Sequence, residues 1–463
     1  MVDRLTRTAK GIRSAISGPN ISLQRRNDST ATLFAAWIFW LVTARLIIPG
    51  WFDYGAGAMQ AAKNDAVSST ITWLLFAGAS AWMVFGRMDA GRQVLRATSP
   101  YFIGLLVLAI CSVAWSIDPG ATARRLIRLV IVVFACLAIT IYGWRERRFQ
   151  EVVRPVVTWF LFGSLIFGLI APDLAIETPI FPHTEHYWHG LAITKNALGA
   201  IASTGTILWL HAWASREVRP LTGACGTLLS FALMALARAA TYMMATSLAC
   251  ALLLLMLGFS RRNRRYIPYI IGALVIATIA YSLAVLDVVP GLDWILSPIT
   301  ALTGKDRSFT NRALIWQITR EHIGFSPIIG TGYGGFWVTA QPGTQAYDFF
   351  VPRTYFYPDE CHDGYLEVMN DLGLVGLLLL FGYLANYLRS ALKLLKTNYT
   401  QAALYLAILF QQLLSGLTES NWLWLDAEMI ILTLATMCLA RHRLERRPIV
   451  GSQLPLARRA QIS

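Results

Sequence analysis

The sequence contains few charged residues and few cysteines. Only 14% of its 463 residues are charged, whereas 56% are hydrophobic, and the mean hydropathy is positive at +0.50. So little charge cannot cover the surface of a water-soluble domain of this size, which excludes a soluble globular protein. The six cysteines are scattered singly, which excludes a disulfide framework and a CxxC metal site. The composition predicts an integral membrane protein.

Twelve apolar runs of roughly 17 to 22 residues are long enough to cross about 30 Å of hydrocarbon as helices. We therefore predict an all-α integral membrane protein with about 12 transmembrane helices and one large periplasmic loop containing short helices. The basic N-terminal stretch is long, and no small-residue cleavage site follows the first apolar run, so the first span is predicted to be an uncleaved anchor. The runs centre near Trp37, Leu75, Val107, Val132, Phe162, Thr204, Leu228, Leu252, Ala273, Leu378, Leu406 and Leu432.

Basic and acidic residues divide unevenly between the two sides of the predicted membrane. With a cytoplasmic N-terminus, the inner segments hold 28 of the 40 Lys and Arg, while 19 of the 26 Asp and Glu lie outside. This distribution satisfies the positive-inside rule and predicts that both termini are cytoplasmic. The net charge of +14 thus reflects orientation in a membrane and does not predict a nucleic-acid partner. The predicted regions are a basic tail over 1–31, transmembrane helices 1 to 9 over 32–287, the periplasmic loop over 288–365, transmembrane helices 10 to 12 over 366–440, and a basic tail over 441–463.

Some arginines lie on the outer side, against this rule. Arg124, Arg125 and Arg128 lie between the third and fourth spans, where they either snorkel or pair with Asp118, or else form an anion site. Arg238 lies in a tight outward turn, ALARAAT, with no acid within ten residues. An arginine at that depth is a functional-site hypothesis by default.

The loop from about 288 to 365 is the one place where the chain could build a folded element outside the membrane. Its first half predicts a turn at Gly304 and a helix from about Thr310 to His322, capped by Ser308 or Thr310. A break at Ser326-Pro327 follows.

Arg312 falls in the first turn of this predicted helix. A cation there opposes the helix dipole, so Arg312 needs an acid or an external anion as its partner. Asp306 is the nearest acid on the preceding segment.

Gly330, Gly332 and Gly335 formally match G-x-G-x-x-G. A dinucleotide site requires a preceding strand and a compartment that contains nucleotides, and neither is expected here. We therefore predict a glycine turn that lets the backbone approach a membrane helix or a ligand.

The second half of the loop contains an aromatic stretch, Tyr347 to Pro358, and then a cluster of acids around His362. The aromatic rings would either form an interfacial belt or stack on sugars or an isoprenoid tail. His362 lies among Asp359, Glu360 and Asp363, where it would either orient a turn in solvent or act as a general base.

In these motifs the sequence resembles the O-antigen ligase and polymerase superfamily. Its segment Leu417-Thr418-Glu419-Ser420 before the last span, together with its general look, resembles the exopolysaccharide polymerase branch more than the ligase branch. It departs from the family pattern at two positions, with Ala237 before the arginine where the family has Ser, and Asp363 where the family usually has Asn. The upstream arginine of the family corresponds to Arg238. The other matching residues are Asn311, Arg312 and Trp316 of the helix, Pro327, Gly330, Gly332, Tyr333 and Gly334 of the turn, and His362, Asp363, Leu366, Gly373, Leu374 and Gly376.

The resemblance implies an inner-membrane, metal-independent glycosyltransferase that needs no cofactor. Such an enzyme passes glycan from undecaprenyl diphosphate to an acceptor hydroxyl on the periplasmic face, with inversion at the anomeric carbon. Guanidinium groups suit the diphosphate leaving group, which makes Arg238 and Arg312 the first choices for catalysis. His362 is the expected base. Further substrate contacts are expected from Arg124, Arg125, Tyr333 and Asp363.

Two functions remain open within the resemblance. A polymerase extends lipid-linked repeat units, whereas a ligase transfers the glycan to lipid A core. The resemblance also implies two further partners, a chain-length regulator and membrane lipids. A transporter is a third hypothesis from another class, but it should show paired half-repeats with broken helices. The sequence shows no such internal symmetry.

Overall fold

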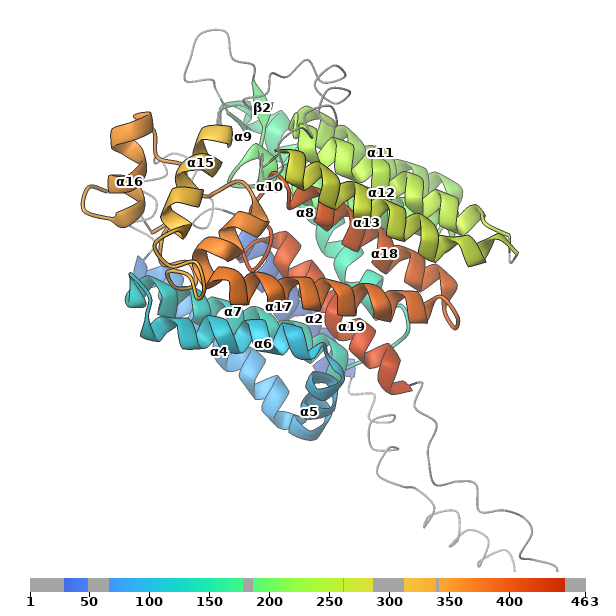
Figure 1. The fold of residues 1–463 in the computed structure, drawn as a ribbon. Coiled ribbons are helices and arrows are strands. Elements are labelled where there is room, and N and C mark those ends of the chain that lie inside the picture. The colour runs from blue at the N-terminus through green and yellow to red at the C-terminus, as the bar shows by residue number, and fades with distance from the viewer. Residues whose placement is uncertain are drawn as a thin grey trace, which may run out of the picture.

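The structure is a computed structural model that describes residues 29–48, 66–177, 186–260, 262–285, 312–338 and 341–445. It is an all-α membrane protein, whose long helices pack side by side while most of the shorter elements gather at one end (Figure 1). The long helices are α2 (Ser29–Ile47), α4 (Ala66–Gly86), α6 (Pro100–Cys111), α7 (Pro119–Ile141), α8 (Arg148–Ile170), α10 (Lys195–Ala214), α11 (Pro220–Leu236), α12 (Ala240–Gly258), α13 (Ile267–Val285), α17 (Gly364–Leu394), α18 (Tyr399–Ser415) and α19 (Ala427–Glu445).

Each of the twelve predicted span centres lies in one of these helices, which confirms the predicted helical fold. Among the described residues, five helices are long and apolar enough to cross a membrane, namely α2, α4, α8, α12 and α17. The number rises to six if a bent pair of helices counts as one span. Twelve crossings therefore remain a prediction.

The bent pair lies where the sequence predicted an inner connection. Helix α5 (Met88–Ala97) meets α6 and the following 3-10 turn η3 (Ser112–Ala114) at 107°. Pro100 opens α6, and Val94 is buried while Asp89 and Arg92 are exposed. A short helix with one apolar and one charged face is typical of the membrane interface.

Short elements surround the other end of the bundle. They are α9 (Pro172–Ala175), the antiparallel pair β1 (Ile176–Glu177) and β2 (Tyr187–Trp188), α15 (Arg312–Ile323) and α16 (Gln345–Thr354). The 3-10 turn η4 (Asn263–Tyr266) instead connects α12 and α13 at their opposite ends, where Arg264 lies over the ring of Tyr399 at the start of α18. Helices α15 and α16 share a small hydrophobic core of their own, in which Trp316, Trp337 and Phe350 are buried. The aromatic stretch from Tyr347 to Pro358 thus contributes Phe350 to this core, whereas Tyr355 in the same stretch is 93% exposed.

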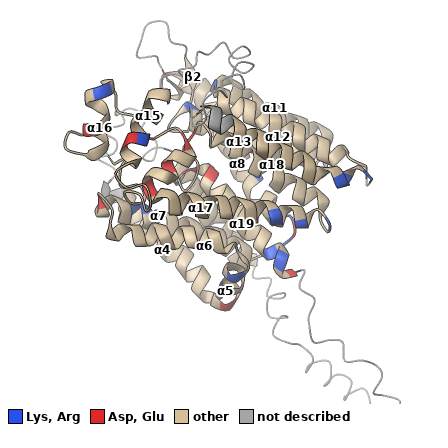
Figure 2. Cartoon of the chain, viewed as in Figure 1, with Lys and Arg blue, Asp and Glu red and all other residues tan. Residues whose placement is uncertain are grey.

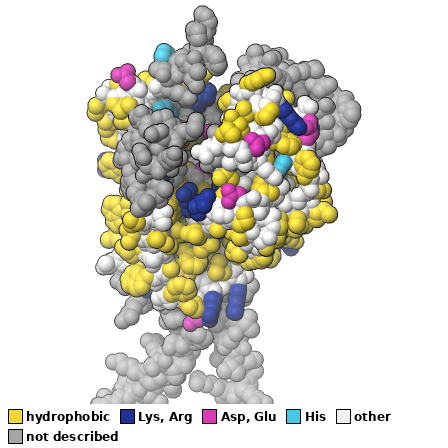
Figure 3. All heavy atoms as spheres, turned by 90° about the vertical axis from the view of Figure 1, so that its left-hand side faces the viewer, with side chains coloured by type: hydrophobic (Ala, Val, Ile, Leu, Met, Phe, Trp, Pro, Cys, Tyr) yellow, Lys and Arg dark blue, Asp and Glu magenta, His cyan; other side chains and the backbone are white. Residues whose placement is uncertain are grey.

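The surface is divided in the way that a membrane protein requires. Figure 3 shows hydrophobic side chains over a broad band of one face, with basic side chains at its lower end. Figure 2 shows basic residues at the ends of α5 and α19, whereas acidic residues gather in the opposite part of the bundle, near α15 and the start of α17.

The glycine turn after α15 inserts into a break in α17. Gly373 has a left-handed φ of +63°, which interrupts the helix. Leu374 N donates to Pro327 O at 2.9 Å and Val375 N donates to Ile328 O at 3.1 Å, while Thr331 N and Gly332 N donate to the carbonyls of Asn370 and Asp371, each at 3.0 Å. The turn therefore satisfies backbone groups that the break exposes, which confirms that its glycines allow a close backbone approach.

A β-carbon would not fit at this contact. At Gly330, where φ is +69°, it would lie 2.4 Å from the backbone of Asp371; at Gly373 it would lie 2.3 Å from that of Ile328. The two glycine motifs of the sequence are thus the two halves of one interface, which fixes the first segment of α17.

Helix α15 is described from Arg312 onward, which agrees with the predicted helix at its C-terminal end. The predicted turn at Gly304, the caps Ser308 and Thr310, and the partner Asp306 lie outside the described residues, as do Asn311, the basic tail over 446–463 and most of the tail over 1–31.

Candidate active site

The site is built around the connection between α18 and α19, residues 416–426, which we call the 416–426 loop. Gly364 N donates to Gly416 O at 2.9 Å, Asn421 Nδ2 donates to Gln412 O at 2.9 Å, and the hydroxyl of Tyr333 donates to Leu423 O at 2.6 Å. These bonds hold the loop against α17 and the glycine turn. Glu419, near its middle, is only 5% exposed.

Arg312 at the start of α15 reaches this loop with two of its nitrogens. Its Nη2 lies 2.9 Å from Glu419 Oε1, and its Nη1 donates to the carbonyl of Thr418. The acid that the sequence required for Arg312 is therefore Glu419, which lies 107 residues away along the chain.

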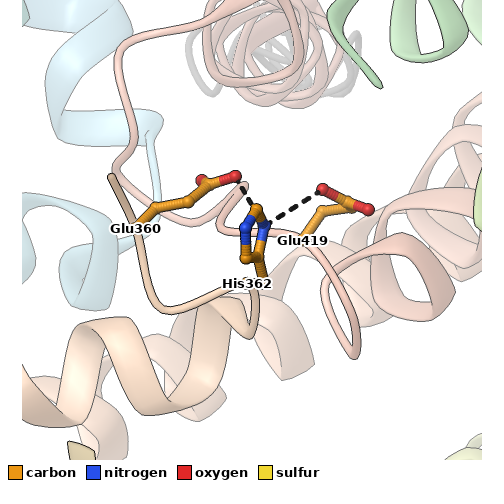
Figure 4. Close-up of side chains that lie close together, drawn as sticks. All are labelled: Glu360, His362 and Glu419. Atoms are coloured by element: carbon orange, nitrogen blue, oxygen red, sulfur yellow. Dashed lines mark ion pairs between the residues drawn. The ribbon is translucent and has the colours of Figure 1, made fainter. Parts of the chain in front are cut away.

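His362 lies between two carboxylates, as Figure 4 shows. Its Nδ1 is 2.9 Å from Glu360 Oε1 and 3.8 Å from Glu419 Oε2. His362 has a left-handed φ of +54°, just before α17 begins. Left-handed backbone in a non-glycine residue costs free energy that the surrounding contacts must supply, and such strain is concentrated at functional sites.

The carboxylates determine the charge of His362. Burial alone would lower the pKa of its imidazole, but the contacts with Glu360 and Glu419 outweigh burial and raise the pKa to about 9. Burial would likewise raise the pKa of Glu419, yet His362 and Arg312 hold it below its ordinary value. At neutral pH the site thus contains a protonated His362 and an ionised Glu419.

A small pocket opens beside His362. Asn196, at the start of α10, donates to Glu419 Oε2 at 3.0 Å from one wall. The pocket has mixed walls. Its apolar lining residues are Leu46, Ile47, Ala197, Ala200, Ile201 and Ala427, and its polar and aromatic lining residues are Thr194, Asn196, Tyr242, Glu360, Glu419, Ser420, Trp424 and Asp426.

Arg238 lies in the neighbouring turn between α11 and α12, with a left-handed φ of +51°. It lines an open pocket of about 880 Å³ whose other walls come from α9, the β1–β2 pair and α11 and are mostly apolar. Thr241, three residues after Arg238, accepts a hydrogen bond of 2.9 Å from the hydroxyl of Thr418. The turn that carries Arg238 therefore touches the loop that holds Arg312 and His362.

The arginines that the sequence placed between the third and fourth spans have structural contacts. Arg125 donates to Trp337 O at 2.6 Å, and its guanidinium lies 4.7 Å above the ring of Trp424. Arg128 lies over Trp73. Asp118 caps α7 by accepting from Ala121 N at 2.8 Å.

Arg124 is exposed in the first turns of α7. The structure joins Arg125 to the periphery of the site through Trp424, and the substrate contacts predicted for Arg124 and Arg125 remain predictions.

Tyr333 and Asp363 are buried parts of the scaffold. The hydroxyl of Tyr333 donates to the carbonyl of Leu423 in the 416–426 loop. Asp363 Oδ1 caps α17 by accepting from the backbone nitrogens of Tyr365 and Leu366, each at 2.9 Å. Burial raises the pKa of Asp363 to about 7. Asp363 thus supports His362 by fixing the helix start that follows it, and a substrate contact for either residue remains untested.

The donor atoms of Glu360, His362 and Glu419 lie within 4.8 Å of one another, a spacing that can hold a metal ion. Arg312 lies 2.9 Å from Glu419, and both carboxylates favour the protonated form of His362, so a metal ion would have to displace a proton from the imidazole in order to bind here. We therefore interpret the three residues as an ion-pair network.

Glu419 and Asn196 are site residues that the sequence did not predict. Glu419 lies in a short connection between two apolar helices. Its segment was noted only for its likeness to the polymerase branch, and the need of Arg312 for an acid indicated that a partner existed without identifying Glu419. The sequence gave no indication that Asn196 belongs to the site, because a polar residue in the first turn of a helix is common.

Comparison with known proteins agrees with the motifs. Residues 223–381, which include Arg238, Arg312 and His362, match a family described as O-antigen ligase. Over 312 residues the chain is 26% identical to the exopolysaccharide production protein ExoQ of Rhizobium meliloti (strain 1021). The aligned region covers 62% of this chain and 65% of the length of that relative. These two matches support the resemblance of the chain to the O-antigen ligase and polymerase superfamily.

Proposed function

We propose that the protein is an inverting, metal-independent glycosyltransferase of the inner membrane, which takes glycan from undecaprenyl diphosphate at the periplasmic face. It polymerises lipid-linked repeat units of an exopolysaccharide or O-antigen. The observation that carries this proposal is the joining of Arg312 and His362 through Glu419. A phosphate-binding group and a proton acceptor are thereby held beside one another.

The reaction is a single displacement. The acceptor hydroxyl attacks the anomeric carbon of the donor and gives its proton to the neutral form of the His362 imidazole. The bond between that carbon and the diphosphate oxygen breaks, and the diphosphate leaves with the electron pair. Arg312 and Arg238 stabilise the charge that develops on it, for which such groups supply roughly 3 to 4 kcal/mol each.

The pocket next to Arg238 supports the choice of donor. Its lining combines apolar side chains, among them Ala232, Ala235 and Leu236, with the cation of Arg238. An apolar surface beside a guanidinium suits a ligand that has an isoprenoid tail and an anionic head.

A ligase that uses lipid A core as acceptor is the second candidate, because the matching family is described as O-antigen ligase. The printed name of the relative, an exopolysaccharide production protein, favours the polymerase.

Reconstitution tests both candidates. The purified protein in liposomes is supplied with undecaprenyl-diphosphate oligosaccharide, with and without lipid A core, and the products are separated by size. Lengthened lipid-linked chains without core are the expected result. Transfer only onto core identifies a ligase, and the absence of transfer in both mixtures contradicts a glycosyltransferase.

A further inference from the structure

Glu419 uses both of its carboxylate oxygens within the site. Oε1 binds Arg312 at 2.9 Å, while Oε2 accepts from Asn196 at 3.0 Å and lies 3.8 Å from His362 Nδ1. With only 5% of the residue exposed, these contacts replace the solvent that an ionised carboxylate would otherwise require. The carboxylate is therefore shared between two cations from different elements.

This sharing fixes the plane of the Arg312 guanidinium. One nitrogen contacts Glu419 and another contacts the carbonyl of Thr418, so two of the N–H directions point to one loop. Because a guanidinium is rigid and planar, its remaining N–H donors then have a set direction, which is what bidentate binding of a phosphate needs.

The same carboxylate separates two like charges. Arg312 opposes protonation of His362, whereas Glu360 and Glu419 favour it. Loss of the negative charge at Glu419 would leave the two cations facing each other in a buried place, where repulsion is weakly screened.

We propose that Glu419 is a positioning residue that couples the diphosphate-binding Arg312 to the proton-accepting His362, so that one side chain sets both donor affinity and base strength. This inference rests on the proposed function for the tasks of Arg312 and His362. It adds a residue on which both tasks depend, together with Asn196, which orients it.

Glu360 provides a matched control. It lies closer to His362 than Glu419 does, at 2.9 Å, and among the described residues no contact joins it to Arg312. Glu360→Gln therefore removes a carboxylate from His362 alone, whereas Glu419→Gln removes one from both groups at nearly constant volume.

The experiment compares the two variants with the wild-type protein in the liposome assay as a function of pH and donor concentration. Glu419→Gln is expected to raise the donor KM by about tenfold, equivalent to about 1.4 kcal/mol, and to move the midpoint of the pH profile to lower pH. Glu360→Gln is expected to move only the midpoint. If Glu419→Gln leaves the donor KM unchanged, or if both variants raise it equally, the inference is wrong.

A measurement without substrate separates this inference from the proposed function. The signal of His362 among the seven histidines is identified by NMR from the spectrum of His362→Gln, and its titration is followed in each variant. A lower midpoint in Glu419→Gln supports the coupling even if the wild-type protein transfers no glycan, and an unchanged midpoint overturns it. If Glu419→Gln fails to fold, Glu419→Asp is measured in its place. Because this variant keeps the carboxylate charge, the titration midpoint of His362 should stay unchanged, and a lowered midpoint contradicts the inference.

Discussion

Gly373 lies against the backbone of Ile328, and the break that it makes in α17 receives the glycine turn. Alanine at Gly373 or Gly330 would have to adopt a left-handed φ and would also collide with backbone. The left-handed conformation alone costs of order 1 to 3 kcal/mol. We expect both substitutions to lower the thermal unfolding midpoint in detergent. Gly78→Ala is the control, because no atom lies within 4 Å of its β-carbon position in α4, and an unchanged midpoint in Gly373→Ala would contradict this interpretation.

Arg312→Lys tests whether the shape of the guanidinium matters in addition to its charge. A lysine ammonium is a point charge and cannot hold Thr418 and Glu419 in one plane while also binding a diphosphate. We expect kcat/KM for the donor to fall by about 10² to 10³. Arg353→Lys, in an exposed ion pair with Glu321, should leave the activity unchanged. A loss of less than about threefold at Arg312 would show that charge alone suffices.

The pH dependence of transfer follows from the charge of His362. The ionisable groups around it are Glu360, Glu419, Arg312 and Asp359, and its pKa is raised to about 9, so roughly one molecule in a hundred has a neutral imidazole at pH 7. We expect kcat/KM to rise with pH with a midpoint near pH 9, and to level off above about pH 10. A profile that falls above pH 9 would mean that the imidazolium is the working form, and His362 would then not be the base.

Stability should change in the opposite direction. Because the pKa of His362 in the folded protein is raised above its ordinary value, its ion pairs stabilise the fold fully below about pH 6.5. This contribution is lost as the pH rises through about 9. The unfolding midpoint of the wild-type protein should therefore fall more between pH 6 and pH 10 than that of His362→Gln.

Chelation tests the ion-pair interpretation of Glu360, His362 and Glu419. Since Arg312 and the protonated imidazole already balance the carboxylates, EDTA should leave the rate of glycan transfer unchanged. The measurement is the rate in liposomes before and after dialysis against EDTA. Loss of activity that added Mg²⁺ or Mn²⁺ restores would instead indicate a metal site.

Filling the pocket beside Arg238 tests where the donor binds. Ala235→Trp places an indole in that pocket, and we expect the donor KM to rise by about tenfold or more. Leu228→Trp is the control, since Leu228 lies on the same helix, is 68% exposed and does not line the pocket. An equal effect of the two substitutions would indicate a general disturbance of α11.

The sequence predicted the positions of the long helices well, because hydrophobic runs of span length are a direct consequence of burial in lipid. It also predicted the helix at Arg312 and the close backbone approach of the glycine turn. It did not predict the break at Gly373, since an isolated glycine in an apolar run gives no indication that another segment approaches it.

The site was only partly predictable for a related reason. Arg312 and His362 stand out locally, because a cation at a helix start and a histidine among acids are both unusual. Glu419 and Asn196 join them from connections that are distant in sequence, and periodicity carries no information about such contacts. Arg125 and Tyr333 were predicted to contact substrate, and the structure shows their polar groups bonded to backbone carbonyls.

The acidic lining beside His362 has a consequence for turnover. In the proposed donor the diphosphate is esterified at both ends, and transfer frees one end, where the terminal phosphate can take up an additional negative charge near neutral pH. Glu360 and Glu419 line the adjoining pocket, so in the proposed reaction the spent lipid carrier would experience stronger repulsion than the loaded one. Product expulsion would then be favoured by the same carboxylates that give His362 its basicity.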